Sequence, residues 1–202
     1  MAEVDGWLER LESRRTTLFS VAAGVLAVFA ANTVLEAFAG TSYPVIQGFV
    51  GPAGFLVGVL GLFSLYPALA DETPRLARLA AAVAALPLVG WFLILLMSIG
   101  EAIGVVGPPS GPLVVIPIGT IATTMLAYGL FGGVVFGSDV PTRVVGAFLL
   151  VPAVMFVLLL SRTTAPFVID LGHFAGHLGV ALTLWTRGVP ADRTEPAADA
   201  AT

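Results

Sequence analysis

The chain has 202 residues, of which 57% are hydrophobic and only 11% are charged. About a quarter of the residues of a soluble domain are charged, so this composition excludes an ordinary soluble protein and predicts a multi-pass protein of the cell membrane. The absence of cysteine excludes disulfides and thiolate metal ligands. The net charge of −4 offers no basic patch for nucleic acid, and the use of arginine in place of lysine is typical of GC-rich, halophilic prokaryotes.

Residues 1–16 precede the first apolar stretch and mix charged with apolar residues. Val4, Trp7, Leu8 and Leu11 recur at helical spacing, which predicts a short amphipathic lead-in at the membrane interface. A cleaved signal peptide ending near residues 37–40 is the alternative. The acidic residues before the apolar stretch argue against it, because signal peptides begin with a basic segment.

Six apolar stretches then follow, each long enough to cross a hydrocarbon core as a helix. They predict an all-α, six-helix transmembrane domain over residues 17–187, followed by a disordered cytoplasmic tail at 188–202. Prolines at positions 67, 87, 117 and 152 predict kinks within the spans. The spans are expected at residues 17–38, 45–69, 79–103, 112–136, 144–160 and 166–185.

Arginine placement predicts the orientation of these spans. Eight of the nine arginines precede the first span, lie in the second and fourth loops, or follow the last span, whereas only Arg162 lies on the other side. The positive-inside rule therefore places both termini in the cytoplasm.

Both histidines of the chain lie in the sixth span, where Asp170, His173 and His177 share one helix face. Ionisable groups within a span are costly and therefore mark functional candidates. A structural ion pair or hydrogen-bonded pair between Asp170 and His173 is the alternative.

Further polar residues are expected at similar depth in the outer half of the membrane. Glu36 and Glu101 lie close enough to span ends to be solvated boundary residues, and the threonines of the fourth span can bond to their own helix carbonyls. The candidate polar site comprises Asn32, Glu36, Glu101, Thr124 and Asp170.

Glycines at helical spacing suggest how the spans pack. Gly172 and Gly176 form a Gly-x-x-x-Gly on the sixth span, and Gly129 and Gly133 repeat this spacing on the fourth. Small residues let two backbones approach closely, so we expect the fourth and sixth helices to touch.

The segment GHFAGHLGVAL (172–182) resembles the last transmembrane segment of rhomboid intramembrane proteases, and the resemblance covers about the last 80 residues. It implies six helices with cytoplasmic termini and would make His173 the general base. The family's Gly-x-Ser-Gly is absent, and Thr120 is the nearest hydroxyl at the nucleophile position. The resemblance therefore implies a protein without protease activity that binds other membrane helices.

Two other functions fit the same residues. The His-x-x-x-His of His173 and His177 can chelate zinc, with Asp170 or another carboxylate as third ligand, and it also resembles a motif of the progestin-receptor and ceramidase group of membrane hydrolases. Alternatively, the acidic and histidine residues conduct protons or cations. Because no complete catalytic set can be assembled, binding or scaffolding without a cofactor is the leading prediction.

Overall fold

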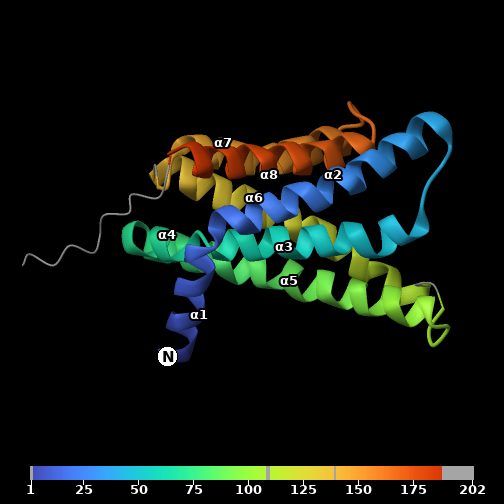
Figure 1. The fold of residues 1–202 in the computed structure, drawn as a ribbon, viewed down its shortest axis with the longest axis horizontal. Helices are drawn as coiled ribbons and strands as arrows, with labels where there is room; N and C mark the ends of the chain where they lie inside the picture. Colours follow the sequence, from blue (N-terminus) through green and yellow to red (C-terminus); the bar gives the residue numbers. More distant parts are fainter. Residues whose placement is uncertain (1, 108–109, 139, 188–202) are drawn as a thin grey trace, which may run out of the picture.

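The computed structural model describes residues 2–107, 110–138 and 140–187. The chain forms an elongated bundle of antiparallel helices joined by short connections (Figure 1). A single turn of π-helix, η1, begins the second span, and a 3₁₀ turn, η2, begins the fourth. The elements are α1 (Ala2–Ser13), α2 (Arg15–Ala39), η1 (Ile46–Val50), α3 (Gly51–Phe63), α4 (Tyr66–Glu72), α5 (Pro74–Ala102), η2 (Gly111–Val114), α6 (Val115–Ser138), α7 (Arg143–Leu160) and α8 (Phe167–Arg187).

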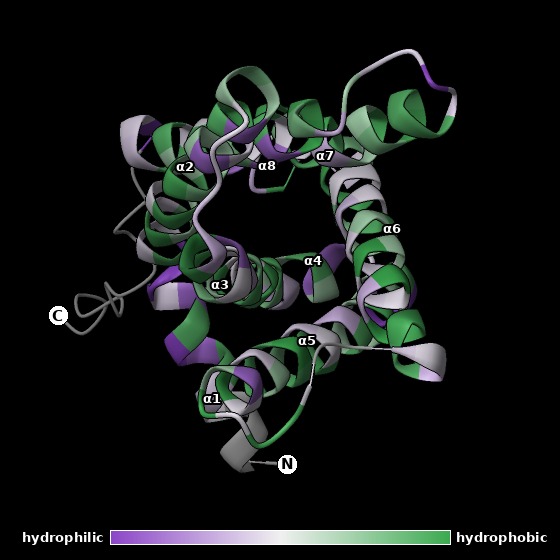
Figure 2. Cartoon of the chain, turned by 90° about the vertical axis from the view of Figure 1, so that its right-hand side faces the viewer, coloured by the Kyte–Doolittle hydropathy of each residue, from purple (hydrophilic) through white to green (hydrophobic). Residues whose placement is uncertain are grey.

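Six of these helical stretches are long and apolar enough to cross a membrane, which confirms the predicted fold class and number of spans. The second span consists of η1, α3 and α4 together. Hydrophobic residues predominate along the spans (Figure 2), as is required of helices surrounded by hydrocarbon. The protein is therefore a multi-pass membrane protein, whereas the cytoplasmic location of its termini stays a prediction.

The second span departs from the expected continuous helix. It breaks at Ser64 and Leu65, and Pro67 lies in the first turn of the new helix α4. The expected kink at Pro67 is therefore wrong, because proline fits a helix start, where its missing N–H is not needed. The connection expected between the second and third spans, at residues 70–78, is also shorter, since Thr73 alone separates α4 from α5.

The core forms because each helix turns small or apolar residues inward. On α2 the side chains of Phe19, Leu26 and Ala30 are buried. They are seven and four residues apart and therefore share one face of the helix. On the first half of α5 the inward positions include Ala77 and Ala84, which allow close packing. Apart from the buried Trp91, many of the larger side chains of α5, such as Leu86 and Phe92, face outward, a distribution typical of a helix whose outer face contacts lipid or another membrane helix.

The expected contact of the fourth and sixth spans through glycines is wrong. A Cβ on Gly172 would meet Met155 of α7, and one on Gly176 would lie 2.9 Å from the Phe148 carbonyl oxygen of α7. Gly129 also faces α7, whereas Gly133 has no such neighbour within 4 Å. Helix α7 therefore packs on the glycine faces of both α6 and α8, and these two helices meet through longer side chains instead.

Helix α1 runs crosswise to the bundle (Figure 1). Trp7 of α1 contacts Phe63 of α3, with ring centroids 6.5 Å apart. This direction is compatible with a helix at the membrane interface, although that location stays a prediction. The tail predicted at 188–202 lies outside the described residues.

Candidate functional site

The two histidines lie one helical turn apart on α8 and are enclosed within the bundle. His173 is 0% exposed and His177 is 1% exposed. Their rings are tilted by only 26° from one another, with centroids 6.4 Å apart. Neither imidazole faces lipid, so both belong to the interior of the protein.

Backbone hydrogen bonds assign the proton on each ring. Nδ1 of His173 lies 3.1 Å from the Ile169 carbonyl oxygen, and Nδ1 of His177 lies 2.7 Å from the His173 carbonyl oxygen. A carbonyl oxygen can only accept, so each Nδ1 carries a hydrogen and donates it. In the neutral ring Nε2 is then an acceptor.

Tyr128 of α6 supplies the partner for one of these acceptors. Its hydroxyl lies 2.6 Å from Nε2 of His177, and because this nitrogen is the acceptor, the tyrosine O–H donates. Tyr128 is itself only 1% exposed. In contrast, Nε2 of His173 is buried and has no hydrogen-bond partner.

Aromatic side chains from three other helices surround His173, two in direct contact and one through Phe55. Phe55 of α3 meets the imidazole edge-to-face at a centroid distance of 4.8 Å, and Trp91 of α5 stacks on Phe55 at 4.5 Å. Tyr128 makes a second edge-to-face contact with His173 at 5.6 Å. We call His173, His177, Tyr128, Phe55 and Trp91 the histidine–aromatic centre.

A hydrogen bond anchors the indole of this centre to α6. Nε1 of Trp91 donates to Oγ1 of Thr124 at 2.8 Å, and the same hydroxyl donates to the Thr120 carbonyl oxygen at 2.6 Å. The proton of Thr124 is therefore engaged with its own helix. This threonine contributes an acceptor to the packing of α5 on α6.

Replacing Trp91 with phenylalanine is expected to lower the free energy of unfolding by about 1 kcal/mol. The variant retains an aromatic ring against Phe55 but loses the bond to Thr124. Thermal unfolding in detergent micelles measures the change. Trp7→Phe, at a half-exposed ring of α1, is the control, and equal shifts in both variants would contradict a contribution from the buried bond.

The other predicted polar residues separate into local pairs. Oδ1 of Asn32 accepts from the Tyr43 backbone N–H at 2.9 Å, and Oε2 of Glu36 accepts from Nε2 of Gln47 at 2.6 Å. These two bonds attach α2 to the connection that follows it and to η1. The carboxyl group of Asp170 interacts with the side chain of Thr33 of α2. Glu101 is exposed near the end of α5.

No hydrogen bond connects His173 with Thr120, Asn32 or Glu36, because its only bonded ring nitrogen contacts Ile169. Thr120 lies on the side of α6 that meets α5, where a Cβ on Gly90 would contact its hydroxyl. The structure therefore does not form the expected pair of Thr120 as nucleophile and His173 as base.

The expected zinc ligands are likewise not gathered. Within the described ranges, no three His, Asp or Glu side chains lie close enough together to hold a metal ion. Nδ1 of each histidine is engaged with a carbonyl oxygen, and Asp170 interacts with Thr33. Zinc binding, intramembrane hydrolysis and ion transport stay predictions.

Sequence reasoning missed the residues that complete the centre. Tyr128 and Trp91 each carry a polar group in the middle of an apolar span, which is a signal that a buried partner is required. Phe55 carried no such signal, since a phenylalanine in a span is ordinary. The partnership became visible only when α3, α5, α6 and α8 were placed together.

Comparison of the chain with protein-family models, curated proteins and solved structures found no match. The six apolar helices define its class as that of multi-pass membrane proteins.

Proposed function

We propose that the chain is a non-catalytic, rhomboid-like membrane protein that binds other transmembrane helices. The observation that carries the proposal is that three of the four ring nitrogens of the two histidines already have hydrogen-bond partners within the bundle. Tyr128 occupies Nε2 of His177, and the nearby hydroxyl of Thr124 donates to its own helix. A general base must reach the proton that it removes, and in the described part of the chain no serine or threonine hydroxyl bonds either imidazole.

In this proposal the histidine–aromatic centre stabilises one arrangement of the helices in the bundle. Its side chains come from α3, α5, α6 and α8, and they contact one another through a hydrogen bond, a ring stack and edge-to-face ring contacts. Hydrogen bonds between membrane helices favour one arrangement of the helices over alternatives, because apolar contacts with lipid and with protein are similar in energy. A rigid bundle presents its outer faces in fixed positions.

The outer face of α5 supports the binding of a helix. Leu79, Leu86 and Leu93 are exposed and lie seven residues apart. Val89 and Leu96, three residues after Leu86 and Leu93, are exposed as well. This 3.5-residue period is the pattern by which one helix packs along another. From Leu79 to Leu96 the stripe extends about 26 Å, nearly the thickness of the hydrocarbon core.

Energy transfer in liposomes tests the proposal. A fluorescent transmembrane peptide with leucines at heptad positions serves as the probe, and the cysteine-free chain accepts a single label at Ser161→Cys in the exposed connection after α7. Replacing Leu86 and Leu93 with alanine is expected to weaken binding about tenfold, because the peptide loses its central contacts.

The control variant replaces Val154 and Val157 of α7, which are also exposed, with alanine. Equal binding by the α5 variant and the control, or equal binding of a scrambled peptide, would contradict the helix-binding role. Cleavage of the peptide that disappears in Thr120→Ala would contradict the non-catalytic role.

A further inference from the structure

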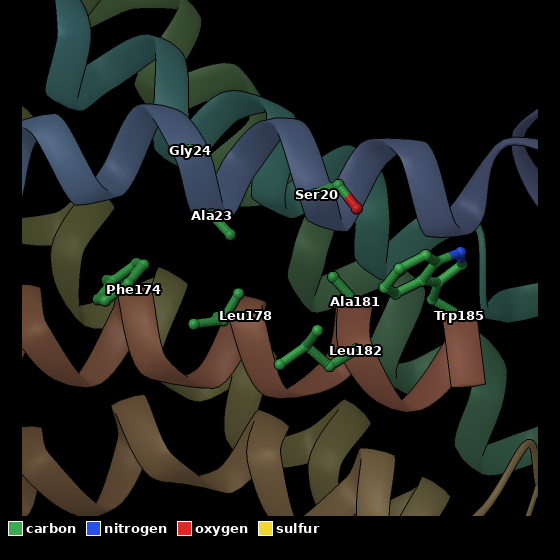
Figure 3. A pocket seen from close by; sticks show the side chains of 8 residues that line it. All are labelled: Ser20, Ala23, Gly24, Phe174, Leu178, Ala181, Leu182 and Trp185. Atoms are coloured by element: carbon green, nitrogen blue, oxygen red, sulfur yellow. The ribbon is translucent and has the colours of Figure 1, made fainter. Parts of the chain in front are cut away.

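A groove between α2 and α8 runs along the outside of the bundle and has a volume of about 290 Å³. On the α2 side it is lined by the small residues Ser20, Ala23 and Gly24 (Figure 3). On the α8 side it is bounded by larger apolar side chains, with Phe174 and Trp185 at its two ends. The groove is separate from the histidine–aromatic centre, none of whose residues lines it.

The length of the groove matches one leaflet. Between Phe174 and Trp185 it extends about 16 Å along α8, and half of a hydrocarbon core measures about 15 Å. A complete transmembrane helix would need contact over twice that length. A single lipid chain fits the groove, because Gly24 leaves it open: a Cβ there would meet nothing within 4 Å.

The end of the groove at Trp185 carries the chemistry of a membrane interface. Trp185 is 75% exposed, and tryptophan favours the level of the lipid headgroups. Arg187 lies two residues further along α8, and Arg14 immediately precedes α2; both are exposed. Arg15 follows, with its Nε buried and without a hydrogen-bond partner and its Nη1 4.0 Å from Glu12. The three arginines Arg14, Arg15 and Arg187, at the ends of α2 and α8 that border the groove, favour an anionic headgroup.

We infer that this groove binds an anionic phospholipid of the leaflet at the arginine-rich end of the bundle. One acyl chain lies between Gly24 and the leucines of α8, and the phosphate lies near Arg14 and Arg187. The indole of Trp185 lies beside the glycerol region. Positive-inside placement makes this the cytoplasmic leaflet.

Quenching of tryptophan fluorescence by brominated lipids tests the inference. The Trp7→Phe variant leaves Trp185 and the buried Trp91 as fluorophores. In nanodiscs, brominated phosphatidylglycerol is expected to quench at about tenfold lower mole fraction than brominated phosphatidylcholine. Arg14→Gln with Arg187→Gln is expected to abolish this preference.

Gly24→Leu fills the groove and is expected to reduce quenching by phosphatidylglycerol to the level of phosphatidylcholine. Gly133→Leu is the matched control, because it adds the same side chain to another exposed glycine without neighbours within 4 Å. Equal quenching by both lipids in the parent, or unchanged preference in Gly24→Leu, would overturn the inference. A dimer in native mass spectra that only Gly24→Leu abolishes would place a second copy in the groove and would also overturn it.

Discussion

Replacing Gly58 with alanine is expected to lower the free energy of unfolding by about 2–4 kcal/mol. A Cβ on this residue of α3 would contact Nε2 of His177 and would lie 2.6 Å from the Tyr128 hydroxyl oxygen. The methyl group must therefore push apart the two partners of a buried hydrogen bond. Chemical or thermal unfolding in detergent micelles, followed by circular dichroism, measures the loss.

Gly133→Ala supplies the control for this prediction, because a Cβ on that glycine of α6 meets nothing within 4 Å. There we expect no loss, and a small gain from the greater helix propensity of alanine. Combining Gly58→Ala with Tyr128→Phe should recover part of the stability, because the phenylalanine removes one of the two crowded atoms. If Gly58→Ala and Gly133→Ala unfold alike, α3 does not press on the histidine–aromatic centre.

The hydrogen bond between Tyr128 and His177 is expected to couple the two residues by about 1–2 kcal/mol. Tyr128→Phe should cost about 1–3 kcal/mol, because it leaves Nε2 of His177 buried without a partner. His177→Ala removes the imidazole and leaves a cavity in addition. The double variant should therefore lose less than the sum of the two single losses, and unfolding in micelles measures all four proteins.

A second cycle separates this bond from general effects of Tyr128. Thr183 lies on α8 with His177, but its hydroxyl donates to the Gly179 carbonyl oxygen of its own helix. Tyr128→Phe and Thr183→Val should therefore be additive to within about 0.5 kcal/mol. Additivity in the cycle with His177 would mean that the observed bond contributes no net stability.

These two predictions concern the same physical problem, which is how a membrane bundle obtains a unique arrangement. Apolar side chains gain little by leaving lipid for protein, so packing and hydrogen bonds decide which helices adjoin. The Tyr128–His177 and Trp91–Thr124 bonds connect α6 to α8 and to α5. Gly58 supplies the space that brings α3 against the first of these bonds.

The sequence by itself was sufficient to predict the class and the number of spans, because both follow from local composition. Twenty or so apolar residues must form a helix in a membrane, and a polar side chain within such a helix must find a partner. The sequence also indicated an irregularity of the second span at Pro67, although this proline lies in the first turn of α4 and not at a kink within a continuous helix.

Only the tertiary structure decided which partner each polar group found. Asn32, Glu36 and Asp170 share a membrane half with His173 in the sequence-based topology, yet their side chains face Tyr43, Gln47 and Thr33. Rotation of each helix about its axis separates residues of equal depth, and this rotation depends on contacts with all neighbouring helices at once. For that reason His177 and His173 of α8 contact Tyr128 and Phe55, whereas the glycines of α8 contact α7.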